Sequence, residues 1–434
     1  MNIALKNGFL VTPLNNSFKV EKKDIYIYDG KVSFDKKHDL KIDKEYNLNE
    51  AVIMPGLVNA HHHIYSTLSK GIPVKGPLKD FQGTLEKLWW KLDRVLQKED
   101  VIASTVITLE ESIKQGVSTI FDHHISVPFI KGSLEEMKRV FGKYCLNGVL
   151  AFEISDRNGK EIFNESLAEN IDFYNKHLNS KYIKGTIGMH ASFTISEDSM
   201  KTIKETIKDA PIHIHVAEAQ SDVDKTLEMS GLRVIERLEK YDLLNKNSLI
   251  VHGNILNEKE LQILSEKEIF VIHNPDSNMN NALKIKNISQ TLSQNITLTV
   301  GTDGMTSNML KSYKNAFILN RYLNQDPDTG WDEAMKVLLN AFKLKEAYGF
   351  DLGVREGEEA DMIILDYIPA TPFNDNTFLG HFLFGITEAR VKHFFKREHI
   401  LMEDYKLTKT AQNDFFNNTR KNSVKLFQRF ENLN

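Results

Sequence analysis

The sequence has very little cysteine and no long apolar run. Its 434 residues include one cysteine, Cys145. A single cysteine cannot form an intramolecular disulfide, so any metal chemistry is left to histidine and the carboxylates. No apolar stretch is long enough to cross a bilayer, and the first eight residues lack the basic and then apolar pattern of a signal peptide. We therefore expect a cytoplasmic protein.

An excess of one charge is also lacking. The chain has 55 Lys and Arg residues against 59 Asp and Glu residues, a net charge of -4 at pH 7. This balance provides no bulk attraction to nucleic acid or to an anionic membrane, so we expect neither as a partner. The content of 41% hydrophobic and 26% charged residues is that of an ordinary soluble globular protein. The length suggests two or three domains.

Between residues 56 and 349, short apolar segments alternate with stretches of helical periodicity, such as the helix predicted from Lys98 to Gln115. Eight apolar segments are predicted strands, and each ends in or near a His, Asp or Glu residue. They lie at 52–63, 117–124, 148–153, 186–190, 212–218, 248–252, 269–274 and 296–303. This alternation predicts a (β/α)8 TIM-like barrel, with functional groups where the strands end. A doubly wound sheet is less favoured because it does not explain polar residues at every strand end.

The two ends of the chain have a different texture. Residues 1–55 contain short apolar clusters that we predict as separate strands, with Asp29-Gly30 as a hairpin signal. Residues 350–406 contain two further strand candidates, at 360–366 and 391–395. We predict that both regions form one small β-sandwich domain beside the catalytic barrel of residues 56–349. The overall class is α/β, and residues 407–434 form a C-terminal helical tail.

A histidine triplet ends the first predicted barrel strand. Because side chains alternate along a strand, His61 and His63 face one side and His62 faces the other. His215 on the fifth strand and Asp303 after the eighth could complete a set of four ligands. Such a set suits a hydrolytic site with one divalent metal ion, Zn(II) in first place and Fe(II) as the alternative. We therefore predict a metal held by His61, His63, His215 and Asp303.

Two further residues could handle protons. Glu218 lies three residues after His215, where a carboxylate can protonate a ring nitrogen of the substrate while water attacks the adjacent carbon. The alternative for Glu218 is a charge at a helix N-terminus. His252 ends the sixth strand and could orient the water, although a buried structural histidine would look the same.

Other residues near the strand ends are predicted to shape a substrate pocket. These are His190, His124, Trp89, Arg157, His273 and Asn278. Trp89 could stack on a flat ring or belong to a packed lid or interface. Arg157 could bind an oxo or carboxylate group, or form a salt bridge instead. His190 and His124 could donate hydrogen bonds to the substrate, whereas His273 and Asn278 could support other site residues.

Several motifs carry a family resemblance. The segments 54–63 (MPGLVNAHHH), 213–218 (HIHVAE), 251–253 (VHG), 273–278 (HNPDSN) and 301–304 (GTDG) resemble the deaminase and chlorohydrolase branch of the amidohydrolase superfamily. Within that branch the chain is most similar to the SsnA family of aminohydrolases. That similarity rests on the segments LWWKLDR at 88–94, DHH at 122–124, DRNG at 156–159 and SNMNN at 277–281.

The resemblance implies the same fold, the same four metal ligands and the same roles for Glu218 and His252. It also implies that Asp303 accepts a proton from the water and passes it to the leaving group, and that the protein is a homodimer. The fourth strand ends in Met189-His190-Ala191 without the lysine that bridges two metals in binuclear relatives, which favours a single metal.

The function implied is a metal-dependent aminohydrolase that releases ammonia from a small nitrogen heterocycle, purine-like in preference. Glu218 favours a poor leaving group such as an amine. One alternative is a dechlorinating or ring-opening hydrolase of a triazine- or pterin-like ring. Another is a scaffold that kept the fold without catalysis, which the intact ligand set disfavours.

Overall fold

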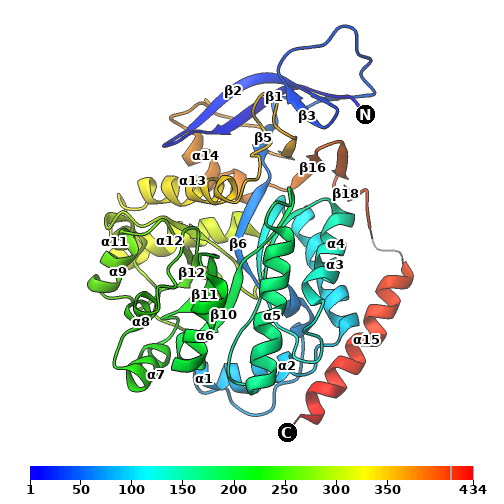
Figure 1. Cartoon of the computed structure of the whole chain (residues 1–434). Helices are drawn as coiled ribbons and strands as arrows, with labels where there is room; N and C mark the ends of the chain where they lie inside the picture. The colour runs from blue at the N-terminus through cyan, green and yellow to red at the C-terminus, as the bar shows by residue number, and fades with distance from the viewer. Residues whose placement is uncertain (411–412, 434) are drawn as a thin grey trace.

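The computed structural model describes residues 1–410 and 413–433, and shows a helix-covered barrel with a β-sheet body at one end (Figure 1). The barrel strands are parallel and buried. They are β6 (Leu57–His62), β7 (Val117–His124), β8 (Asn147–Phe152), β9 (Ile183–Gly185), β10 (Ile187–Ala191), β11 (Ile212–Val216), β12 (Leu249–His252), β13 (Phe270–His273) and β14 (Leu298–Val300). Because β9 and β10 together occupy the fourth position, the ring has the eight strand positions predicted from sequence.

The ring closes at two seams. Strands β6 to β9 form one hydrogen-bonded sheet and β10 to β14 form another. An isolated bridge between Ile154 and Met189 joins the sheets on one side, and a bridge between His62 and Asp303 joins them on the other. A Cβ atom at Gly188 would lie 2.3 Å from the carbonyl oxygen of Phe152, so this close approach requires glycine. The (β/α)8 prediction is confirmed.

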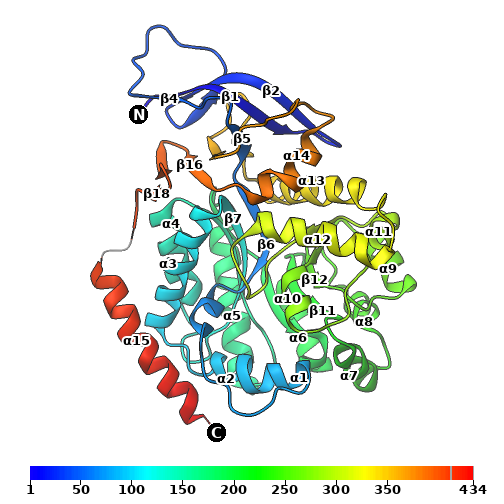
Figure 2. The same cartoon turned by 180° about the vertical axis from the view of Figure 1, so that it is seen from behind.

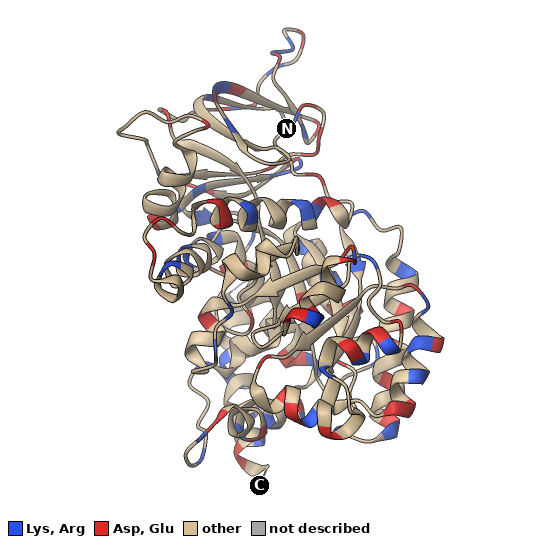
Figure 3. Cartoon of the chain, turned by 90° about the vertical axis from the view of Figure 1, so that its left-hand side faces the viewer, with Lys and Arg blue, Asp and Glu red and all other residues tan. Residues whose placement is uncertain are grey.

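Helices cover the outside of the barrel (Figures 1 and 2). They include α3 (Lys98–Lys114), α4 (Ser133–Tyr144), α5 (Lys160–His177), α6 (Glu197–Ile207), α7 (Gln220–Ser230), α8 (Val234–Lys240), α9 (Glu258–Ser265), α11 (Ile288–Ser293), α12 (Met309–Asn324) and α13 (Trp331–Ala347). Helix α3 matches the predicted helix to within one residue. Its buried face includes Val101, Leu109 and Ile113, which recur at helical spacing. Basic and acidic side chains are interspersed over the outer helices (Figure 3).

The second body is one nine-stranded sheet built from both ends of the chain. Its strands are β1 (Ile3–Pro13), β2 (Phe18–Tyr28), β3 (Lys31–Ser33), β4 (Lys44–Asn47), β5 (Val52–Pro55), β15 (Asp361–Leu365), β16 (Val391–Lys396), β17 (His399–Glu403) and β18 (Lys406–Leu407). Asp29-Gly30 turns the predicted hairpin between β2 and β3.

Strand β1 is where the sheet differs from the prediction. The two apolar clusters at its ends were predicted as separate strands, but they belong to one strand with an irregularity between Leu5 and Gly8. On one edge β1 pairs with β4 through its first half and with β5 through its second half. This shared strand makes hydrogen bonding continuous across the whole body, whereas a sandwich has two separate sheets.

A buried ion cluster joins the barrel to the sheet. The Oδ2 atom of Asp361 on β15 lies 2.7 Å from the Nζ atoms of both Lys345 on α13 and Lys396 on β16. All three side chains are almost fully buried. The carboxylate is therefore shared by a barrel helix and two sheet strands, and it fixes the position of one body on the other.

The C-terminal helix α15 (Asn413–Asn432) lies against the outside of the barrel beside α3 (Figure 2). Leu426 and Phe430 are buried, and the guanidinium of Arg429 donates to the carbonyl oxygen of Val95 at 3.0 Å and contacts Asp100. Residues 411, 412 and 434 of the predicted tail lie outside the described residues. None of the helices in the described part of the chain combines the length and apolarity needed to cross a bilayer.

Candidate active site

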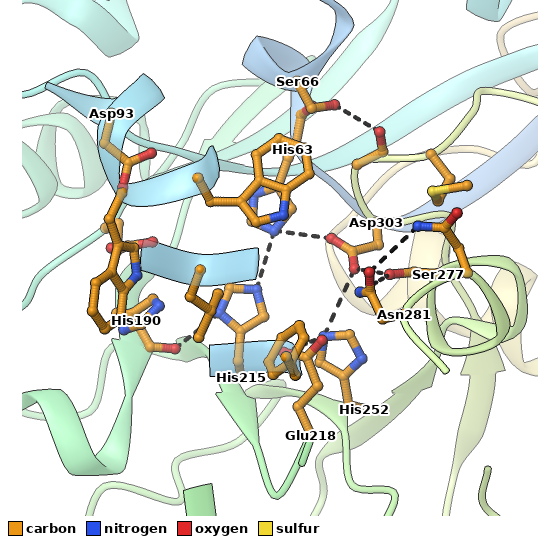
Figure 4. Close-up of a pocket in the computed structure, with 18 of the residues that line it drawn as sticks. His63, Ser66, Asp93, His190, His215, Glu218, His252, Ser277, Asn281 and Asp303 are labelled. Atoms are coloured by element: carbon orange, nitrogen blue, oxygen red, sulfur yellow. Dashed lines mark hydrogen bonds and ion pairs between the residues drawn. The ribbon is translucent and has the colours of Figure 1, made fainter. Parts of the chain in front are cut away.

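Four side chains from the ends of three strands converge at one end of the barrel, and Figure 4 shows three of them, His63, His215 and Asp303. His61 lies on β6, His63 directly follows it, His215 lies on β11 and Asp303 follows β14. The Nε2 atom of His63 is 3.1 Å from Nε2 of His215 and 3.1 Å from Oδ1 of Asp303. The Nε2 atom of His61 is 3.6 Å from the same carboxylate oxygen. The sequence therefore identified residues that the fold brings within reach of one ion.

The histidine rings are held from behind. Nδ1 of His63 lies 2.6 Å from the carbonyl oxygen of His123, and Nδ1 of His215 lies 2.9 Å from that of His190. A carbonyl can only accept, so each Nδ1 carries a hydrogen and each Nε2 points toward the cluster, where the neutral ring offers a lone pair. Metal-binding histidines are commonly oriented in this way.

His61 completes the arrangement. Its Nδ1 lies 2.8 Å from Nε2 of His213, whereas its buried Nε2 has no hydrogen-bond partner. An unpartnered buried nitrogen is costly unless another group binds it. Together with the inward lone pairs of the other two rings, it fits a cation bound among these residues.

The electrostatics of the cluster also favour a cation. Burial lowers the pKa values of His61 and His215. Burial would lower the pKa of His63 too, but its hydrogen bond to Asp303 outweighs this effect and raises that pKa to about 9. Burial opposes ionisation of Asp303, yet the two histidines hold the pKa of its carboxyl well below the usual range. The ionised carboxylate thus draws positive charge to this position.

His62 lies apart from the cluster. Its Nδ1 donates a hydrogen bond to the backbone carbonyl of Asp303 at 2.5 Å and lies 3.3 Å from the hydroxyl oxygen of Thr302. Burial lowers its pKa to about 4, so the ring is neutral at pH 7. His62 therefore contacts the backbone of Asp303 and does not point toward the predicted metal ligands.

The backbone turns sharply where the site residues leave the strands. His252 and Asp303 have φ angles of +67° and +53°, and Ala217, between His215 and Glu218, has a φ of +46°. Left-handed backbone is uncommon for residues other than glycine and clusters at functional sites. A Cβ atom at Gly301 would lie 2.8 Å from the backbone nitrogen of His61, so glycine lets the end of β14 approach β6.

Glu218 and His252 lie beside the metal-ligand candidates. Oε2 of Glu218 is 3.4 Å from Nε2 of His252, which is 4.0 Å from Oδ2 of Asp303. Burial, reinforced by the charges of Asp303 and Asp222, raises the pKa of Glu218 well above its usual range. Burial lowers the pKa of His252 to about 4. Burial therefore favours the uncharged form of both groups.

These groups line one cavity at the ends of the barrel strands. Trp89 and His190 lie on its wall, as predicted from sequence. The remaining lining residues are His63, Tyr65, Ser66, Phe81, Leu85, Trp90, Asp93, Glu153, His215, Glu218, His252, Ser277, Asn280, Asn281, Asp303, Gly304 and Met305.

Some of these wall residues had no role in the sequence-based prediction. Asp93 is the last residue of a short helical segment made of α1 (Phe81–Thr84), the π-helical turn η2 (Leu85–Trp89) and α2 (Trp90–Asp93). Such turns frequently occur at functional sites, but the sequence carries no clear signal for them. Ser277, in α10 (Pro275–Asn280), stands in a recognised motif that gave no hint of its contact with Asp303.

Four residues predicted to shape the substrate pocket do not line the cavity. The Nε2 atom of His124 lies 3.0 Å from the hydroxyl of Ser126, and His273 is buried in the core. Asn278 accepts a hydrogen bond from Nδ1 of His252 at 3.1 Å, which is the predicted supporting role.

Arg157 is the fourth of these residues. It does not line the cavity, and it forms a salt bridge in place of the predicted contact with a substrate oxygen. Its guanidinium lies between the carboxylates of Asp93 and Glu153, and Cζ is 4.8 Å from the ring centre of Trp90. The side chain therefore forms a buried salt bridge behind the wall, because acids from two other segments meet it there.

Comparison with known proteins identifies the family of this chain. The sequence model of the amidohydrolase family matches residues 52–426. The chain is 28% identical to a 5'-deoxyadenosine deaminase of Methanopyrus kandleri, over 96% of this chain and 98% of that protein. It is 26% identical to a 5-methylthioadenosine/S-adenosylhomocysteine deaminase of Pyrococcus furiosus, over 84% and 86% of the two chains. The crystal structure of an adenosine deaminase from Xanthomonas campestris with bound zinc has a TM-score of 0.84 at 18% identity, covering 98% of both chains.

Proposed function

The chain belongs to the amidohydrolase family, as its motifs predicted, and on that premise we propose that it is a metal-dependent aminohydrolase acting on a purine-like ring. One observation supports this most directly. Glu218 and Asp303 share one wall of the cavity, and their environments move their pKa values in opposite directions. Two carboxyl groups separated in this way can act as acid and base in one reaction. Because the relatives are named as deaminases of adenine nucleosides, such nucleosides are the first substrates to test.

The proposed metal ligands are His61, His63, His215 and Asp303. They fit a divalent ion through the inward lone pairs, the unpartnered Nε2 atom of His61 and the ionised carboxylate. Nitrogen and oxygen donors without thiolate suit Zn(II), with Fe(II) as the alternative, and we propose one ion per chain. When bound, such an ion activates water for attack on carbon.

The chain's own side chains would move the protons. Glu218 would donate its proton to the ring nitrogen next to the carbon under attack. His252, neutral and held by Asn278, would orient the attacking water through Nε2. Asp303 would use Oδ2, which lies 4.0 Å from that imidazole, to accept one proton of the water and pass it to the amine, which leaves as ammonia. The second proton of the water would return to Glu218 and restore the acid.

Glu218 also separates the competing reactions. Chloride leaves without a proton, whereas an amine needs one, so a protonated acid in the cavity supports deamination over dechlorination. The complete ligand set supports an enzyme over a scaffold without catalysis. The cytoplasmic location and the homodimer stay predictions.

The test is metal analysis combined with a deamination screen. The purified protein should carry one zinc or iron per chain. It should release ammonia from at least one member of a panel of adenine and guanine nucleosides, free purines, pterins and triazines. His61→Ala should lose metal and activity, whereas His38→Ala, an exposed control, should keep both. A metal-loaded protein that releases chloride but no ammonia would replace the proposal with dechlorination, and a protein unable to bind metal would remove it.

A further inference from the structure

Apart from its histidines, the ionisable groups that charge the cavity wall at neutral pH or above are carboxyl groups. They are Asp93, Glu153, Glu218 and Asp303, and within the described residues neither Lys nor Arg lines this cavity. Asp303 belongs to the proposed metal site and Glu218 to proton transfer. Asp93 lies across the cavity from Asp303 (Figure 4), and Glu153 contacts the same guanidinium, that of Arg157. Neither acid has a proposed part in catalysis.

The positive charge of Arg157 lies beside this wall, but it is already paired with both acids. Its Nη2 atom lies 3.3 Å from Oδ2 of Asp93 and closer still to Oε1 of Glu153. The side chain of Arg157 is 9% exposed and those of both acids are 3% exposed. Two carboxylates against one guanidinium leave the triad without net positive charge even when one acid is protonated.

One carboxylate oxygen of Asp93 on this wall is free to accept a hydrogen bond. Oδ1 of Asp93 is buried and has no hydrogen-bond partner. Burial raises the pKa values of Asp93 and Glu153 against the opposing effect of Arg157, which shows how poorly this wall tolerates further negative charge. A substrate group that donates hydrogen bonds fits here, whereas an anion placed against this wall would be buried beside two acids whose one counter-charge, Arg157, is already paired with them.

We propose that the cavity selects uncharged substrates and rejects those whose substituent carries a phosphate or carboxylate close to the ring system. This inference rests on the proposed function and narrows its substrate class to neutral heterocycles and neutral nucleosides. The outer groove beyond Trp89 contains Lys79 and Asp80. Because Lys79 lines that groove and not the cavity, an anion on a short substituent is the stricter probe.

The test compares matched pairs at pH 8, adenosine with adenosine 5'-monophosphate and guanosine with guanosine 5'-monophosphate. We expect kcat/KM to be at least about a hundredfold higher for the neutral member of whichever pair is turned over, the scale expected for burying an unpaired charge. Glu153→Gln leaves Arg157 with one carboxylate, and should reduce that preference at least about tenfold. Glu165→Gln, an exposed acid on α5, makes the same change in net charge and should leave the preference unaltered.

A binding measurement separates this inference from the proposed reaction. Calorimetry with inosine and inosine 5'-monophosphate on the metal-loaded protein requires no turnover. Tighter binding of inosine supports the selection against anions even if no purine is deaminated, in which case the proposed reaction fails by itself. Equal binding, tighter binding of the phosphate or binding of neither compound overturns the inference. Equal kcat/KM values within a pair would overturn it as well.

Discussion

The hydroxyl of Ser277 donates a hydrogen bond to Oδ2 of Asp303 at 2.5 Å, whereas Oδ1 of the same carboxylate lies 3.1 Å from Nε2 of His63. The two oxygens therefore have different neighbours. Oδ1 faces the proposed metal ligands, and Oδ2 faces Ser277 and, at 4.0 Å, Nε2 of His252. This division holds the carboxylate in one orientation and leaves Oδ2 on the side of His252.

Ser277→Ala should retain the metal but lower kcat/KM by about tenfold to a hundredfold, the equivalent of a hydrogen bond to a charged group. The loss should fall on kcat more than on KM, because Oδ2 acts in proton transfer. Steady-state kinetics and metal analysis check both expectations. Ser293→Ala, on the exposed face of α11, is the matched control. Loss of metal in Ser277→Ala would instead show that the serine holds Asp303 as a ligand.

Glu218→Gln should keep the metal and lose turnover by at least roughly a hundredfold, on the scale of general acid–base contributions. The amide has the same shape but cannot deliver a proton to the ring. Because burial raises the pKa of Glu218, the wild-type enzyme should lose activity as rising pH removes that proton. A pH–rate profile of the wild type, with Glu228→Gln as an exposed control on α7, measures this loss. Unchanged turnover in Glu218→Gln would remove this residue from the mechanism.

Metal uptake should release about one proton per ion near pH 7. The pKa of His63 is raised to about 9 by Asp303, so below that pH an incoming cation must displace a proton from Nε2. Apparent affinity should therefore rise about tenfold per pH unit between pH 7 and 8, and level off above pH 9. Calorimetry in buffers of different ionisation enthalpy counts the protons. A pH-independent affinity would contradict this arrangement of His63 and Asp303.

Much of the site could be predicted because the relevant rules are local. Alternation along one strand puts His61 and His63 on the same face, and the count of strands places Asp303 beside them. Contacts between distant segments could not be predicted in the same way. Nothing near Arg157 in the sequence shows that Asp93, 64 residues earlier, meets its guanidinium.

The fold shows the same limit. The apolar clusters of residues 1–13 correctly predict β structure, but only pairing with β4 and β5 shows that they form one irregular strand. The contact between Ser277 and Asp303 likewise depends on α10 turning back over the cavity, which periodicity does not reveal in so short a helix.

His62→Ala should keep the metal, because this imidazole points to the backbone of Asp303 and not to the cluster. The variant should lose about 2 kcal/mol of unfolding free energy, since it removes a hydrogen bond to a carbonyl at the seam between β14 and β6. Urea denaturation of the metal-loaded protein measures this loss, with His38→Ala as the exposed control. Loss of metal from His62→Ala would show that His62 takes part in ion binding.

Asp361→Asn should destabilise the protein by about 3–5 kcal/mol at pH 7, because it leaves Lys345 and Lys396 buried without their counter-charge. The loss should become smaller as the pH rises from 7 to 9. Burial lowers the pKa of Lys396, to about 8 even with Asp361 opposing the shift, and removing the carboxylate lowers it further. The folded variant then binds fewer protons than the unfolded chain, so its stability rises with pH relative to the wild type.

Urea denaturation at pH 7 and 9 distinguishes this explanation from simple loss of packing, which would not depend on pH. Asp209→Asn, on the exposed surface, is the matched control and should change the unfolding free energy by less than about 0.5 kcal/mol. If Asp361→Asn changed the unfolding free energy as little as the control does, another group would have to balance the charge of the two lysines. The cluster would then not hold the sheet on the barrel. If it unfolds at pH 7 and recovers at pH 9, the charge of the buried lysines is the cause.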